Sequence, residues 1–217
     1  MPPSHPASAP EPTPHGAAAA HGNPAERPAP GGPELVLVHP EIPANTGSIA
    51  RLAAATGARL HLIEPLGFSL DDRYLKRAGL DYWPMVDLWV HANWKAACAF
   101  FERDSERPLH ERLRLFSARG GAPVFEVPFQ RDDLLLFGSE SSGLPTELLS
   151  EHAERRVYVP VKTEVRSLNL SSVATLSLYL SWVRSGVPLP DNDGLYTPHP
   201  DSVRDLFAAD IAQRNEG

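Results

Sequence analysis

The middle of the chain alternates short apolar runs with stretches of helical spacing, and this alternation constrains the fold more than any other feature. The runs LVLV (residues 35–38), RLHLI (59–63) and LLLF (134–137) have the length of buried strands. Stretches with the spacing of helices follow them along the chain. Strands that alternate with helices predict a parallel sheet covered by helices on both faces. We therefore expect an α/β fold.

Cap and turn residues mark the ends of the expected helices. The first helix is predicted to start at Asn45 and Thr46, which are common cap residues, and to stop at Gly57. Further helices are predicted at residues 70–80 and in the second part of 87–103, after a strand. Beyond residue 108 the pattern predicts strand, strand, helix, strand and helix, in that order, within residues 112–121, 132–145, 145–154, 155–161 and 170–186.

The two ends of the chain differ in composition from this middle part. Residues 1–33 contain ten of the 23 prolines and eight alanines. They offer too little apolar surface to offset the entropy that is lost on ordering. We predict a disordered arm over residues 1–33, an α/β domain over 34–187 and an extension over 188–217 that contains a short helix.

Composition argues against several classes of protein. The net charge of −7 argues against a protein that coats nucleic acid through bulk positive charge, while a local basic patch around Arg73, Lys76 and Arg77 stays open. No apolar run approaches the roughly 18 residues that span a bilayer, so no membrane segment is expected. A single cysteine, Cys98, excludes an internal disulfide and a multi-cysteine zinc site, and it suits a reducing cytoplasm. We interpret it as a small buried residue rather than a nucleophile.

Three polar loops follow predicted strands, at the edge where α/β sheets bind ligands. They comprise residues 45–51 (NTGSIAR), 137–145 (FGSESSGLP) and 165–173 (VRSLNLSSV). Each loop taken alone fits a plain structural role, because the first and third contain helix caps and the second is a strand-to-helix turn. The glycines of the second loop also allow a turn that offers main-chain groups to a flat polar ligand.

The second loop partly matches three known motifs and completes none. It is not the G-x-G-x-x-G fingerprint of dinucleotide binding. It has the G-x-x-x-x-G frame of a phosphate-binding loop, but Leu144 and Pro145 stand where Lys and then Ser or Thr should follow. Glu140 stands where the G-x-S-x-G elbow of hydrolases has its serine. We therefore expect neither hydrolysis of nucleoside triphosphates nor serine hydrolase chemistry.

Taken together, the three loops resemble the three motifs of the SpoU-type methyltransferases of the SPOUT superfamily. The motifs read N-x-x-x-x-x-R, F-G-x-E-x-x-G-L-P and R-S-L-N-L-S in this chain. The resemblance continues through residues 40–68 and 77–83, which are similar to the TrmL (YibK-like) group of these enzymes. It covers roughly residues 35–186 and implies a parallel α/β sheet with a deep C-terminal trefoil knot.

The resemblance also implies a cofactor, S-adenosylmethionine, bound by the loops of the knot, and no metal. The positions that match the cofactor contacts of the family are Ala118, Gly138, Glu140, Val159, Ser167 and Leu168.

The implied reaction is methyl transfer to a ribose 2'-OH, which makes RNA the substrate. Members of this group act on nucleotide 34 in the anticodon loop of tRNA, as homodimers. The family account makes the arginine that matches Arg51 the base. A guanidinium stays protonated up to a pH of about 12, so Arg51 could instead clamp a phosphate and stabilise the developing alkoxide. Asn45 and Asn169 would orient the substrate and the loop, with Ser167 nearby.

Two other functions stay open on these motifs. One is a SpoU-type enzyme that methylates another ribose, in tRNA or in ribosomal RNA. The other is a catalytically idle RNA-binding factor on the same fold, which the joint presence of Asn45, Arg51, Glu140, Ser167 and Asn169 argues against.

Overall fold

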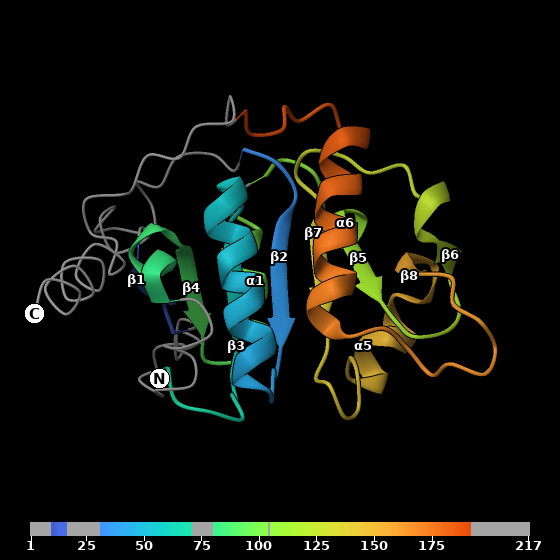
Figure 1. Cartoon of the computed structure of the whole chain (residues 1–217), viewed down its shortest axis with the longest axis horizontal. Coiled ribbons are helices and arrows are strands. Elements are labelled where there is room, and N and C mark those ends of the chain that lie inside the picture. The colour runs from blue at the N-terminus through green and yellow to red at the C-terminus, as the bar shows by residue number, and fades with distance from the viewer. Residues whose placement is uncertain (1–9, 17–30, 71–79, 104, 192–217) are drawn as a thin grey trace, which may run out of the picture.

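A single sheet organises the part of the chain that the computed structural model describes, namely residues 10–16, 31–70, 80–103 and 105–191. Its strand order is β1-β4-β3-β2-β7-β5-β8-β6 (Figure 1). The seven strands from β4 to β6 run parallel, and β1 pairs antiparallel with β4 at one edge. The predicted α/β class with a parallel sheet is confirmed.

The sheet contains short strands. Their bounds are β1 Thr13–Gly16, β2 Glu34–Val38, β3 Leu60–Ile63, β4 Asp87–His91, β5 Leu113–Phe116, β6 Ala122–Pro123, β7 Leu134–Phe137 and β8 Arg156–Tyr158. Every residue of β2, β3, β5 and β7 is buried. Burial on both faces explains why β7 and most of β2 read as continuous apolar runs rather than as alternating patterns. Strands β3 and β5 each bury one polar side chain, His61 and Arg114.

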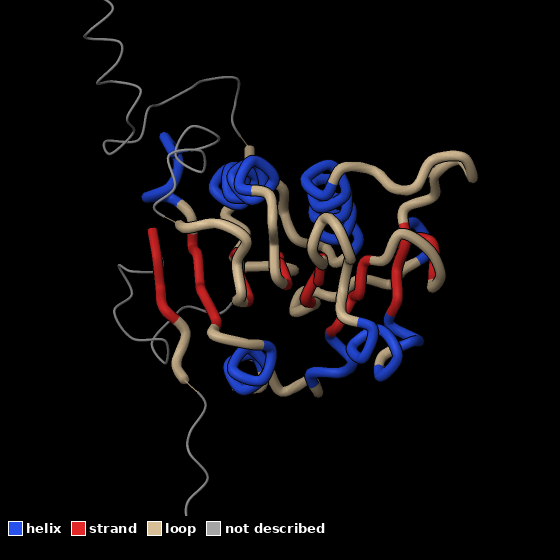
Figure 2. Tube along the Cα trace, turned by 90° about the horizontal axis from the view of Figure 1, so that it is seen from below, coloured by secondary structure: helices blue, strands red, loops and turns tan. Residues whose placement is uncertain are grey.

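Helices cover both faces of the sheet (Figure 2). The α-helices are α1 Pro43–Thr56, α3 Trp94–Phe101, α4 Leu109–Arg112, α5 Thr146–Glu151 and α6 Leu170–Arg184, and the 3₁₀ helices are η3 Leu80–Met85, η4 Val124–Glu126 and η5 Ala153–Arg155. Side chains of α1 and α6 pack into the core on one face, and side chains of α3 and α5 pack into the core on the other. The helix predicted at residues 70–80 and the one in the C-terminal extension lie almost wholly outside the described residues.

Helix α1 begins earlier than its sequence indicates. It starts at Pro43, and Asn45 and Thr46 lie buried in its first turn instead of capping it. Proline favours the first helical position because its fixed φ already suits the helix. The end of the helix is predicted correctly, because Gly57 has a φ of 77° and donates its N–H to the carbonyl of Ala53.

Part of the N-terminal arm has structure that the composition does not predict. Strand β1 pairs with β4, and Thr13 lies opposite Val90 in this pairing. The carboxylate of Glu11 forms an ion pair with the guanidinium of Arg103 at 3.1 Å. An edge strand is held by backbone hydrogen bonds rather than by apolar burial, so a composition with little apolar surface does not exclude it. The expectation of a disordered arm is therefore wrong for these residues.

The strand order reverses direction between β2 and β7. The chain places β3 and β4 on one side of β2, and then places β7, β5 and β8 on the other side. Ligands of open α/β sheets bind outside the carboxyl ends of the strands at such a reversal. The loops that follow β2, β7, β5 and β8 are therefore brought together at one edge, at the lower side of the sheet in Figure 1.

Candidate functional site

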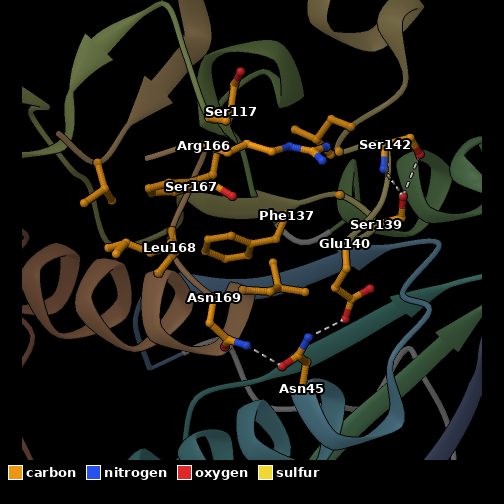
Figure 3. A pocket seen from close by; sticks show the side chains of 18 of the residues that line it. Asn45, Ser117, Phe137, Ser139, Glu140, Ser142, Arg166, Ser167, Leu168 and Asn169 are labelled. Atoms are coloured by element: carbon orange, nitrogen blue, oxygen red, sulfur yellow. Dashed lines mark hydrogen bonds between the residues drawn. The ribbon is translucent and has the colours of Figure 1, made fainter. Parts of the chain in front are cut away.

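A cavity of about 490 Å³ lies at this edge. Its walls come from the residues that directly follow β5, β7 and β8, from the start of α1 and from the segment that leads into α6 (Figure 3). A volume of this size is typical of small-molecule sites. The predicted site residues that line it are Asn45, Ala118, Gly138, Glu140, Val159, Ser167, Leu168 and Asn169.

The loop after β7 forms a tight turn that brings its backbone to the cavity. Ser139 and Gly143 exchange two backbone hydrogen bonds, and Gly143 has a φ of 75°. At Gly138 an added Cβ would lie 1.9 Å from the carbonyl carbon of Gly143. The close approach requires glycine at position 138, and the left-handed φ favours glycine at position 143.

A chain of three polar side chains links the three predicted loops (Figure 3). Asn169 Nδ2 donates to Asn45 Oδ1 at 2.9 Å, and Asn45 Nδ2 donates to Glu140 Oε1 at 2.8 Å. Asn169 also caps α6, because its Oδ1 accepts from the backbone N–H of Ser171 at 2.9 Å. The three motifs are thus physically connected at the bottom of the cavity.

Glu140 also holds the chain just before α1. Its carboxylate accepts from the backbone N–H of Glu41 at 2.9 Å and from that of Ile42 at 3.4 Å, in addition to the amide of Asn45. Negative charge is favoured near a helix N-terminus. The carboxylate therefore has a clear structural task, while the rest of the residue lines the cavity.

Part of the cavity lining is apolar. The rings of Phe116 and Phe137, the last residues of β5 and β7, stack at a centroid distance of 4.7 Å. Val159 and Leu168 add aliphatic surface. A flat aromatic group could lie against this wall while polar backbone groups contact its edge.

Arg51 is the one predicted site residue that the structure does not bring into the cavity. Its side chain is exposed on α1, and its guanidinium lies 5.2 Å from the centroid of the Tyr82 ring. Six residues separate it from Asn45, which turns the side chain roughly 240° around the helix axis. The two side chains therefore leave the helix about 120° apart, Asn45 toward the cavity and Arg51 toward Tyr82.

Several lining residues were not among the predicted site residues, although Phe137 and Arg166 stand within the second and third motifs. Phe116 and Phe137 end apolar strands, and the position at a strand end was the signal that could have identified them. Arg166 directly precedes Ser167 and lines the cavity, with its Nη2 donating to the carbonyl of Ser141 at 2.9 Å. The direction of such a long side chain depends on the neighbouring loop and carries no sequence signal.

Buried histidines lie away from this cavity. His61 Nε2 is 2.7 Å from Glu34 Oε2, and His61 Nδ1 is 2.9 Å from His91 Nε2. Both rings are fully buried and contact Phe100 and Phe101 of α3, on the other face of the sheet. This chain of polar groups belongs to the core, and neither ring lines the cavity that contains the serines of the second loop.

Cys98 lines a second cavity, which opens beside α3 and α5. Burial raises the pKa of its thiol to about 12, and the carboxylates of Glu102 and Glu151 add to this effect. The thiolate is the reactive form of cysteine, so Cys98 is not a nucleophile near neutral pH. The side chain is half-buried rather than fully buried as predicted, and its raised pKa agrees with the expectation that it is not a nucleophile.

Two further findings concern the described residues only. They contain no group of three or more His, Cys, Asp or Glu side chains that could hold a metal ion. None of their helices is both long enough and apolar enough to cross a membrane.

The fold and the cavity define an α/β protein with a cavity of a size suited to a small ligand at the carboxyl edge of a parallel sheet. Residues 33–179 match the model of the SpoU rRNA Methylase family, and the chain belongs to this family. The family predicted from the three motifs is confirmed.

Relatives of known name support this assignment. The tRNA (cytidine(34)-2'-O)-methyltransferase of Methylovorus glucosotrophus is 45% identical over 150 residues, which are 69% of this chain and 93% of the relative. A solved structure described as concerning the 2-OH methylation of C/U34 on tRNA has a TM-score of 0.64 and 46% identity, and the match covers 70% of this chain and 94% of that chain.

A more distant solved structure shares the fold. The SpoU methyltransferase AviRb from Streptomyces viridochromogenes, in complex with the cofactor AdoMet, has a TM-score of 0.63 at 24% identity and covers 76% of this chain and 61% of that chain. This likeness concerns the fold alone.

Proposed function

We propose that this protein is a tRNA methyltransferase that transfers a methyl group from S-adenosylmethionine to the 2'-oxygen of nucleotide 34. One observation carries the proposal: three motifs that lie far apart in the sequence meet in one cavity and are joined by the Glu140–Asn45–Asn169 hydrogen bonds. The activity that gives the relatives their names supports the same choice of target.

The residues of the cavity fit S-adenosylmethionine. The stacked rings of Phe116 and Phe137 and the backbone of the 138–145 loop suit a flat purine. Backbone groups beside Ala118 and Val159, together with Ser167 and Leu168, complete the walls. When bound, this cofactor supplies a methyl group on a positively charged sulfur, and the reaction needs no metal.

The polar chain at the bottom of the cavity would orient the acceptor. Asn45 and Asn169 fix each other and hold the first and third loops at a set distance from Glu140. A preformed arrangement of this kind lowers the cost of aligning a hydroxyl with its reaction partner. We assign Asn45, Asn169 and Ser167 to the positioning of the ribose.

Arg51 would act on the RNA rather than on the cofactor. Its exposed guanidinium can bind a phosphate next to the reacting ribose and stabilise the negative charge that develops on the 2'-oxygen as its proton leaves. Its position outside the cavity supports this division of tasks. The group that takes the proton is not assigned.

A ribosomal RNA target is the second candidate, because the family is described as one of rRNA methylases. The tRNA target is preferred because the identity to the C34 enzymes extends over 93% of the relative from Methylovorus glucosotrophus.

The knot is part of the proposal as well. Strand β8 lies near one edge of the sheet, whereas α6 packs against the centre, on α1, β2 and β7. The chain therefore returns across β5 to the middle of the molecule between these elements, as a C-terminal trefoil knot requires. A knotted chain pulled from its two ends in an optical trap should reach a shorter contour length than an unknotted chain of 217 residues.

We further propose that two subunits form the RNA-binding surface and that the protein acts in the cytoplasm. The net charge of −7 leaves little bulk attraction for RNA. A homodimer would double the few cationic side chains that the anticodon loop can reach. Exposed apolar side chains on α6, namely Tyr179 and Val183, support a contact between copies of the chain.

Transfer to defined RNA substrates tests the proposed target. Purified protein and radiolabelled S-adenosylmethionine are incubated with a tRNA that carries ribose or 2'-deoxyribose at position 34, and a tRNA with deoxyribose at position 32 serves as control. We expect label in the ribose-34 substrate and in the control, and none in the deoxyribose-34 substrate. Equal label in all three would overturn the assignment to nucleotide 34.

A further inference from the structure

Charge is scarce in the walls of the ligand cavity. Among the residues that line it, the only charged side chains are those of Glu140 and Arg166. The carboxylate of Glu140 is engaged by the backbone of Glu41 and Ile42 and by the amide of Asn45. Arg166 therefore presents the cation with which this cavity can meet an anionic group of its ligand.

The guanidinium of Arg166 has donors to spare. It carries five N–H donors, and one hydrogen bond, from Nη2 to the carbonyl of Ser141, is formed. No carboxylate lies within ion-pair distance of it in the part of the chain that the structure describes. The bond to Ser141 holds the head group while leaving the remaining donors open to a ligand.

The position of Arg166 distinguishes it from Arg51, the other arginine of the motifs. In Figure 3 the Arg166 side chain extends from the 165–169 segment across the cavity, above the ring of Phe137 and toward the loop of Ser139 and Ser142. Arg51, by contrast, lies on the outer face of α1 against Tyr82. A small ligand in the cavity would meet Arg166, and RNA on the surface would meet Arg51 first.

We propose that Arg166 recognises the amino-acid carboxylate of S-adenosylmethionine and thereby selects ligands with an intact amino-acid end. This inference rests on the proposed function. The carboxylate is the only anionic group of that cofactor, since its sulfur and its amino group are both positive. A guanidinium fork matches a carboxylate with two parallel hydrogen bonds, which a lysine cannot do.

The surroundings make such a contact selective. The cavity is lined by the hydroxyls of Ser117, Ser139 and Ser142 as well as by phenylalanine, valine and leucine side chains. A carboxylate that lies against the apolar part of this lining without a partner loses hydration that nothing replaces. A ligand that lacks the carboxylate would avoid this cost but gain nothing from Arg166. The two kinds of ligand should therefore respond differently to substitution of the arginine.

Calorimetric binding of two ligands to four forms of the protein tests the proposal. The ligands are S-adenosylmethionine and decarboxylated S-adenosylmethionine, which lacks only the carboxylate. The proteins are the wild type, Arg166→Ala, Arg166→Gln and a control, Arg184→Ala, at an exposed arginine in the last turn of α6. Glutamine keeps a polar amide at this position but carries no charge.

We expect Arg166→Ala and Arg166→Gln to weaken binding of S-adenosylmethionine about tenfold. This is the lower end of the range for a hydrogen bond between charged groups, because the site is exposed to solvent. Binding of the decarboxylated ligand should stay unchanged in both, and Arg184→Ala should bind like the wild type. An equal loss for both ligands would mean that Arg166 only holds the loops, and the proposal would be wrong.

Two other outcomes also decide the matter. If the Arg166 variants bind S-adenosylmethionine normally but bind tRNA more weakly, Arg166 is an RNA contact and the proposal fails while the proposed function stands. If the wild type binds neither S-adenosylmethionine nor its decarboxylated form, the cofactor assignment itself fails, and the inference fails with it.

Discussion

Arg51 and Leu168 lie in different surroundings, so their substitution should have different effects. Arg51→Ala should lower single-turnover methyl transfer by roughly 100-fold, as loss of one charge-stabilising donor does elsewhere, and should leave the affinity for S-adenosylmethionine unchanged. Leu168, which is 43% exposed, lines the cavity beside Arg166. Leu168→Asp should weaken cofactor binding on the order of tenfold, because it replaces apolar surface by a carboxylate.

Binding isotherms and single-turnover rates for both variants check this division. The wild type and both variants are compared at equal folded fraction, measured by circular dichroism. If Arg51→Ala lost cofactor affinity as severely as Leu168→Asp, or kept near-normal turnover, an arginine that faces the RNA would be the wrong description.

Gly138 has no room for a side chain. An alanine Cβ there would lie 1.9 Å from the Gly143 carbonyl carbon and 2.0 Å from the Leu144 nitrogen, which are backbone atoms that cannot turn away. Gly138→Ala should therefore destabilise the fold by about 1–3 kcal/mol or more and weaken cofactor binding. Gly31→Ala is the matched control, since nothing lies within 4 Å of its added Cβ.

Chemical denaturation of both alanine variants measures the effect. The free energy of unfolding of Gly31→Ala should stay within about 0.5 kcal/mol of the wild type. Equal stability of the two variants would show that the turn after β7 is looser than the structure indicates.

At the level of residues, the three motifs identify most of the segments that line the cavity, but they do not identify the contacts that each side chain makes there. Asn45, Glu140 and Asn169 were singled out by their motifs, and they meet in the structure. That Glu140 binds the backbone just before α1, and that Arg166 crosses the cavity, depends on contacts between segments remote in sequence. Such contacts leave no trace in local pattern.

Strand β1 is the element whose removal is most informative. It lies at the β4 edge of the sheet, whereas the cavity lies beside β5, β7 and β8. Deletion of residues 2–30 should lower the free energy of unfolding by about 1–2 kcal/mol, since it removes one exposed edge strand and the Glu11–Arg103 ion pair. The affinity for S-adenosylmethionine should stay unchanged.

Urea denaturation and calorimetry of the truncated protein check both parts of this prediction. Residues 31–33 are retained because Trp182 donates its indole N–H to the carbonyl of Pro33. A large loss of cofactor affinity would mean that the arm contributes to the cavity.

The apolar runs in the sequence predict where the buried strands lie along the chain. They do not predict the order of these strands in the sheet. Continuous apolar runs such as that of β7 identify strands because both faces of the sheet are covered. Alternation alone does not say that β7 rather than β5 lies next to β2. Helix α1 starts at Pro43 rather than at Asn45 and Thr46, because the fixed φ of proline suits the first helical position and Asn45 and Thr46 are buried inside the first turn.

At the scale of the whole molecule, one side of α6 carries apolar side chains that are exposed to solvent. Tyr179 and Val183 are four residues apart, so they share one side of the helix, and Val183 is 59% exposed. If this face joins two subunits, Val183→Glu should shift the protein from dimer to monomer in sedimentation velocity. Ser150→Glu, on α5 at the other face of the sheet, adds the same charge and should not change the mass.

A wild type that sediments as a monomer would contradict the homodimer outright. A Val183→Glu variant that remains dimeric would move the interface to another surface of the molecule.

The central claim is methylation of nucleotide 34, and the tRNA of cells that lack this protein tests it most directly. Mass spectrometry of ribonuclease fragments compares that tRNA with tRNA from the parent cells and from cells complemented with Arg51→Ala. The account predicts loss of a 2'-O-methyl group at position 34 in a subset of tRNAs, restored by the wild-type gene and not by the Arg51→Ala gene. Unchanged modification at position 34, with a methyl group lost elsewhere in tRNA or in ribosomal RNA, would contradict it.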